Sequence, residues 1–160
     1  MSNPLSTPND YATFIHSLPN RYSSLRRSSL TYIPLGAKVG KVVGMIFFDG
    51  NIILCVQEFL NFDLHIIEGY GYEVSRSHAN KDDLPQAEEY CRASYPHKDK
   101  LYWYDSFPHP RDPSLAATHP HHKHIPPNIK RNRIPAPDLT FTAPNLPFLI
   151  EEIEQTVLSA

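Results

Sequence analysis

The sequence has few cysteines and no long apolar run. These two features argue against a disulfide-rich protein, a cysteine-ligated zinc protein and a membrane-spanning protein. Only two cysteines occur in 160 residues, 36 positions apart, and they form no CxxC pair. That spacing indicates neither a disulfide framework nor a thiolate zinc site. No apolar run approaches the roughly 18 residues of a membrane span, and the first residues lack the charged and apolar regions of a secretory signal. A cytoplasmic protein is therefore expected.

Proline, in contrast, is abundant. The chain has 16 prolines, about twice the usual share, and 11 of them lie from Pro96 to Pro147. The apolar and charged shares, 41% and 20%, are ordinary for a globular protein. We therefore expect one domain, residues 1–160, in which a proline- and histidine-rich irregular arm occupies 108–143.

Helical signals stand at the two ends of the chain. Thr7 before Pro8 is typical of a helix N-cap, and apolar residues then repeat with helical spacing until Pro19. This pattern predicts a helix over 7–19. A second apolar stripe, beginning at Leu146, predicts a helix over 145–158.

Strand signals fill the region between. β-Branched and aromatic runs flank the "DG" at Asp49-Gly50 and predict a hairpin with strands near 39–48 and 51–60. A further strand is expected near 64–76, a short helix after Asp83 and another strand in "KLYWYDSF". The predicted fold class is α+β: an antiparallel sheet, residues 30–107, covered by the terminal helices.

Charge is unevenly distributed. From 109 to 134 the chain has five basic residues and one acid, whereas the remainder has 10 basic and 16 acidic residues. A basic segment of this kind is typical of a site that binds a polyanion, although solvated loops show the same charge pattern.

The most unusual motif is the histidine tract "HPHHKH" at 119–124. Flanking prolines disfavour a helix, so the tract is expected to be extended. Side chains alternate in extended chain. His121 and Lys123 are therefore expected on one side, and His122 and His124 on the other.

Three interpretations of this tract are open. Its imidazoles can ligate a transition metal. They can act as acid and base on a phosphodiester, with a cation stabilising the phosphate charge. They can also be polar residues of a loop without a chemical role.

Two carboxylates on predicted strands are candidate partners for the histidines. Glu58 interrupts an apolar strand, and Asp105 ends the aromatic run "LYWY". A carboxylate can hold an imidazole in one tautomer. The alternatives are that Glu58 is solvated and that Asp105 bonds to the backbone of the following turn.

Several motifs together resemble a known family. They are "GMIFFDGNIIL" at 44–54, Glu58, "YDSFPHP" at 104–110, "HPHHKH" at 119–124 and "PNLPFLIEEIE" at 144–154. Over residues 30–158 the chain is similar to the TumE-like toxin components of bacterial toxin–antitoxin pairs. The resemblance implies a toxin with a cognate antitoxin, and the histidine chemistry adds the expectation of RNA cleavage.

The sequence therefore predicts a toxin that is a metal-independent endoribonuclease, with RNA as substrate and no cofactor, metal or membrane partner. The expected catalytic residues are His109, His121, His122, Lys123, His124, Glu58 and Asp105. The expected RNA-binding residues are Arg111, Lys130, Arg131 and Arg133. A metal-dependent nuclease or hydrolase using the same histidines, and a non-enzymatic module that binds nucleic acid or protein, are the alternatives.

Overall fold

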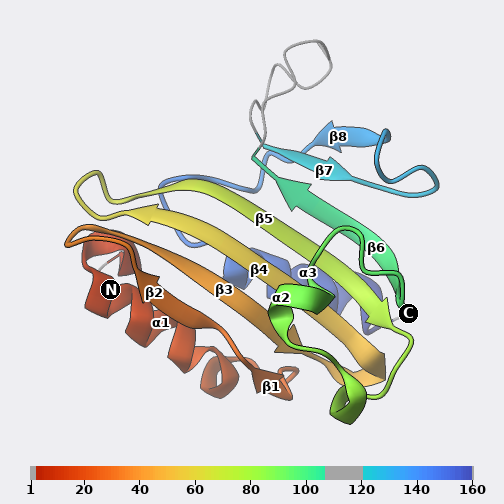
Figure 1. Cartoon of the computed structure of the whole chain (residues 1–160). Coiled ribbons are helices and arrows are strands. Elements are labelled where there is room, and N and C mark those ends of the chain that lie inside the picture. The colour runs from red at the N-terminus through yellow and green to blue at the C-terminus, as the bar shows by residue number, and fades with distance from the viewer. Residues whose placement is uncertain (1–2, 107–120, 160) are drawn as a thin grey trace.

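The computed structural model describes residues 3–106 and 121–159. These residues form an eight-stranded antiparallel sheet with helices against it, which confirms the α+β prediction (Figure 1). The strands are β1 (Arg27–Ser28), β2 (Thr31–Pro34), β3 (Val39–Phe47), β4 (Ile52–Asn61), β5 (Ile66–Ser77), β6 (Lys98–Asp105), β7 (His122–His124) and β8 (Arg133–Pro135). From β3 to β8 each strand pairs with the next one along the chain.

The predicted hairpin is present, since β3 and β4 pair from Phe47↔Ile53 to Val39↔Asn61. Gly50 and Asn51 at its turn have φ angles of 74° and 61°. Glycine and asparagine are the residues that tolerate this left-handed region best. The turn residues therefore favour the register in which β3 and β4 pair.

Two helices cover one face of the sheet, which we call the helix face (Figure 1). Helix α1 spans Pro8–Arg21, and the Thr7 side chain caps it by accepting a hydrogen bond from the Asp10 amide. It continues two residues beyond Pro19. Proline disturbs the turn that precedes it, because it lacks the amide hydrogen that would bond to the carbonyl four residues earlier, so the residues after Pro19 can stay helical. Helix α3 spans Leu146–Glu152 and continues as a π-helical turn, Ile153–Val157.

The short helix α2 (Ala87–Tyr90) lies on the other face, which we call the α2 face. A satellite core of Met45, Phe47, Ile53, Cys55 and Tyr90 lies beneath it. A disulfide joins Cys55 of β4 to Cys91, with 5.8 Å between the Cα atoms. The spacing in sequence had indicated no such pair, and it is the fold that brings the two residues together.

The described part of the expected arm contains two short strands between irregular segments. Residues 122–124 and 133–135 extend the sheet as β7 and β8, so the described part of the tract that lies in β7 is extended as predicted and is paired on both sides. Proline does not prevent this, because neither Pro120 nor Pro126-Pro127 lies within β7. The histidine tract is thereby held on regular structure.

Candidate active site

The register between β6 and β7 brings separate parts of the sequence together. Asp105 lies opposite His122, and Trp103 lies opposite His124. Opposite residues of antiparallel strands project from the same face. The predicted alternation is therefore present: His122 and His124 are buried on the α2 face beside Asp105, and Lys123 projects from the helix face.

Asp105 is the centre of this cluster. Its Oδ1 atom lies 2.5 Å from His122 Nε2, and its Oδ2 atom lies 3.3 Å from His124 Nε2. Burial by itself raises the pKa of Asp105, but hydrogen bonds from the two histidines and their positive charge lower that pKa well below its usual range. The carboxylate is thus kept ionised and serves both imidazoles.

His124 has a fixed orientation. Its Nδ1 atom lies 2.9 Å from the carbonyl oxygen of Ile129. A carbonyl only accepts, so Nδ1 carries a proton and donates it to Ile129, which leaves Nε2 as the ring atom that faces Asp105. Trp103 stacks on the ring, with 4.5 Å between centroids and 30° between planes.

A groove on the α2 face adjoins the cluster. It has a volume of about 210 Å³, and Gly71, Glu73, Trp103, Asp105 and the Cys55–Cys91 disulfide are among the residues that line it. Gly71 lies opposite Asp105, and a Cβ atom added there would meet nothing within 4 Å. The missing side chain therefore leaves space next to the carboxylate.

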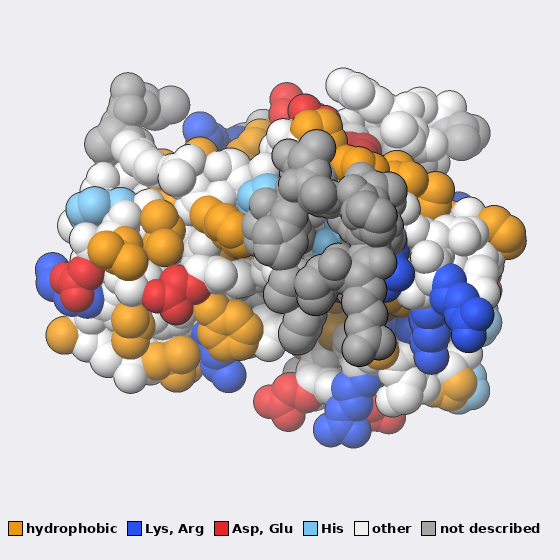
Figure 2. Space-filling model, turned by 90° about the horizontal axis from the view of Figure 1, so that it is seen from above, with side chains coloured by type: hydrophobic (Ala, Val, Ile, Leu, Met, Phe, Trp, Pro, Cys, Tyr) orange, Lys and Arg blue, Asp and Glu red, His pale blue; other side chains and the backbone are white. Residues whose placement is uncertain are grey.

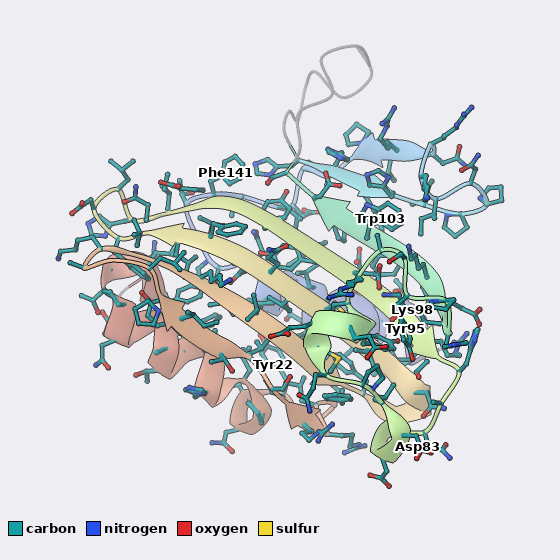
Figure 3. The ribbon with its side chains drawn as sticks, viewed as in Figure 1. Tyr22, Asp83, Tyr95, Lys98, Trp103 and Phe141 are labelled. Carbon is teal, nitrogen blue, oxygen red and sulfur yellow. A yellow bond between two sulfur atoms is a disulfide. The ribbon has the colours of Figure 1, made fainter. Side chains whose placement is uncertain are left out.

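Charges at the far end of the groove are paired. Lys98 Nζ lies 2.5 Å from Glu73 Oε1, and the Lys98 side chain is completely buried. Figure 3 shows Lys98 and Tyr95 close to α2, and Trp103 further along β6. Lys98 and Glu73 thus hold the wall of the groove together.

Basic residues follow the cluster along the chain. Arg133 of β8 lies opposite His124, and Lys130 and Arg131 are exposed in the β7–β8 connection. Viewed from above, several Lys and Arg side chains gather on the right-hand side of the molecule (Figure 2). The position of Arg133 in the sheet puts a cation on the same face as the two buried histidines.

The remaining described members of the tract have partners on the helix face. His121 Nδ1 lies 2.6 Å from the Tyr70 hydroxyl, and the two rings are parallel. Lys123 donates to Glu152 over 3.2 Å and lies above the ring of Tyr102. Both side chains therefore project away from Asp105.

Glu58 also lies on the helix face, completely buried. Tyr11 donates a hydrogen bond of 2.6 Å to one of its carboxylate oxygens, and Tyr72 donates one of 2.5 Å to the other. Burial raises the pKa of Glu58, and these two hydrogen bonds offset part of the rise. Its described contacts link the sheet to α1, not to a histidine.

The structure brings together three of the predicted catalytic residues, Asp105, His122 and His124. His109 and Arg111 lie outside the described residues, so the predicted approach of His109 to the tract stays a prediction. Trp103 and Gly71 were not predicted. The aromatic run "LYWY" was the available signal for Trp103, and no local pattern singles out Gly71.

The same three side chains are suited to hold a metal ion. One ligand atom from each of Asp105, His122 and His124 lies within 4.8 Å of the other two. Two imidazoles and one carboxylate are a common ligand set for zinc and its neighbours.

These features define a single-domain α+β protein with a histidine–carboxylate cluster on one sheet face. The family model described as Toxin TumE matches residues 15–157. The chain belongs to the TumE toxin family, as its motifs predicted. No curated protein and no solved structure matches the sequence. Across residues 3–106 and 121–159, no helix combines the length and apolarity that crossing a bilayer demands.

Proposed function

We propose that this toxin cleaves RNA without a metal ion, at the cluster of Asp105, His122 and His124. The observation that carries the proposal is the 2.5 Å contact between Asp105 and His122, with His124 on the same carboxylate. An imidazole oriented by a carboxylate is the usual arrangement of a histidine that transfers protons.

The reaction needs two proton transfers. One imidazole takes the proton of a ribose 2′-hydroxyl, and the 2′-oxygen attacks the adjacent phosphorus. The bond from phosphorus to the 5′-oxygen breaks, and the other imidazole gives that oxygen a proton. The products are a 2′,3′-cyclic phosphate and a free 5′-hydroxyl, and no proton is gained or lost overall.

The substrate would reach the cluster through the groove. The side chains of His122 and His124 are 2% and 6% exposed, whereas the Asp105 side chain is 21% exposed and lines the groove. Arg133, on the same face, is suited to the phosphate that carries the developing charge. Lys130 and Arg131 would hold the neighbouring phosphates by charge alone.

Three of the predicted catalytic residues that the structure describes do not carry this proposal. Lys123 and Glu58 lie on the helix face, where Glu152 and two tyrosines are their partners. Their predicted roles in catalysis, and that of His121, stay predictions. A toxin also implies a cognate antitoxin, and we propose the cytoplasm as the place where the two proteins meet.

The test is incubation of the purified, untagged protein with total RNA in the presence of a chelator. The proposal predicts fragments ending in 2′,3′-cyclic phosphate. The variant His122→Ala, His124→Ala should be inactive and should no longer inhibit growth, whereas His78→Ala, which removes an exposed histidine–aspartate pair, should behave as wild type. Intact RNA, or a toxic double variant that folds normally, would instead favour a binding module.

A further inference from the structure

The cluster on the α2 face has the side chains of a metal site as well as those of a proton-transfer site. We propose that Asp105, His122 and His124 bind one divalent ion of the zinc class, and that the occupied site is the inactive form of the proposed ribonuclease. The first half concerns binding alone, and the second half rests on the proposed function.

The spacing of the ligand atoms fits one small ion. Atoms bound to a tetrahedral zinc ion at about 2.0–2.2 Å lie roughly 3.3 Å apart. His124 Nε2 already lies 3.3 Å from Asp105 Oδ2. His122 Nε2, at 2.5 Å from Oδ1, would move slightly outward, and the widest separation in the group is within 4.8 Å.

The hydrogen bond that orients His124 also suits a metal ligand. A histidine that ligates a metal usually donates its other ring N–H to a carbonyl or carboxylate. His124 does so through Nδ1 to Ile129, which leaves Nε2 as the ligand atom. Trp103 stacks on the same ring and restricts its rotation.

The site is held on regular structure, and its two imidazoles are buried. Its ligands belong to two hydrogen-bonded strands, β6 and β7. A metal site gains affinity when its ligands are held in place before the ion arrives. Two nitrogen ligands and one oxygen favour zinc, cobalt or nickel over magnesium and calcium, which prefer oxygen.

Occupancy by a metal ion and proton transfer exclude each other. The ion would use the Nε2 lone pair of His124 and the Asp105 oxygens, the same atoms that the proposed reaction needs for moving protons. A bound ion would therefore stop RNA cleavage until a chelator removed it. The site would then couple the toxin to the supply of free zinc.

Cobalt is the probe for the binding half, because Co²⁺ replaces zinc and absorbs visible light when bound to imidazole. Untagged, chelator-treated protein should bind one Co²⁺ per chain, and Zn²⁺ should displace it. In Asp105→Asn and His124→Ala the affinity should fall by at least about 10-fold, the loss typical for even an outer partner of a ligand. His78→Ala should bind as wild type does.

If the wild type binds no Co²⁺, the proposed metal site is wrong. Equal Co²⁺ affinity in the folded Asp105→Asn variant, which keeps the size of the side chain, would also contradict it. The activity assay separates the two halves. We expect one equivalent of Zn²⁺ to abolish RNA cleavage and a chelator to restore it. Cleavage that requires the ion would leave the site standing and overturn both its inhibitory role and the metal-independent mechanism.

Discussion

Replacing Glu58 with glutamine removes a buried charge and keeps the shape of the side chain. In the wild type burial raises the pKa of Glu58, and hydrogen bonds from Tyr11 and Tyr72 offset part of that rise. The folded protein thus binds this proton more tightly than the unfolded chain, whose glutamates titrate near pH 4.3. The contribution of Glu58 to stability is full below that pH and is lost as the pH rises through the folded pKa.

The size of the effect follows from that linkage. Between the unfolded and the folded pKa, the wild type loses up to about 1.4 kcal/mol of unfolding free energy per pH unit through this group. Glu58→Gln lacks this loss, so its stability relative to the wild type should increase with pH in that window. Glu58→Ala instead leaves two buried tyrosine hydroxyls without an acceptor, at about 1–3 kcal/mol each.

Urea unfolding of the three proteins from pH 4 to pH 8 measures these differences. A Glu58→Gln curve that runs parallel to the wild-type curve at every pH would refute the raised pKa. RNA cleavage by folded Glu58→Gln should stay near the wild-type rate. A fall of about 100-fold, as expected for the loss of a catalytic acid or base, would instead support the role that the sequence predicted for Glu58.

Three further predictions concern the α2 face. Asp105→Asn should lower the initial rate of RNA cleavage by about 10²–10⁴-fold, and an unchanged rate would contradict its role. Gly71→Ala should narrow the groove and lower cleavage while leaving the thermal midpoint close to that of the wild type, since the added Cβ meets no atom within 4 Å; full activity would show that substrate does not use the groove. Cys91→Ser should lower the unfolding free energy in non-reducing buffer by about 3–4 kcal/mol, because the disulfide closes a loop of 36 residues. The same stability with and without reductant in the wild type would contradict this.

Elements that depend on neighbouring residues were predictable from the sequence. The Thr7 cap, the "DG" hairpin and the extended histidine tract each follow from backbone preferences within a few positions. The alternation of His122, Lys123 and His124 follows from the same local rule. These predictions needed no knowledge of the rest of the chain.

Features that depend on pairing between distant residues were not predictable. The sequence does not say that β7 pairs with β6 in the register that puts His122 opposite Asp105. It also does not say which face a buried acid occupies, so Glu58 was grouped with the histidines although Tyr11 and Tyr72 are its partners. The pairing of Cys55 with Cys91 depends in the same way on where α2 packs.

The most direct test compares two neighbouring substitutions on opposite faces of β7. His122→Asn and Lys123→Met are assayed for the initial rate of RNA cleavage with a chelator present, at equal concentrations of folded protein. A reaction centre on the α2 face predicts a loss of at least about 100-fold for His122→Asn and a rate near that of the wild type for Lys123→Met. An inactive Lys123→Met beside an active His122→Asn would contradict the account and move the chemistry to the helix face.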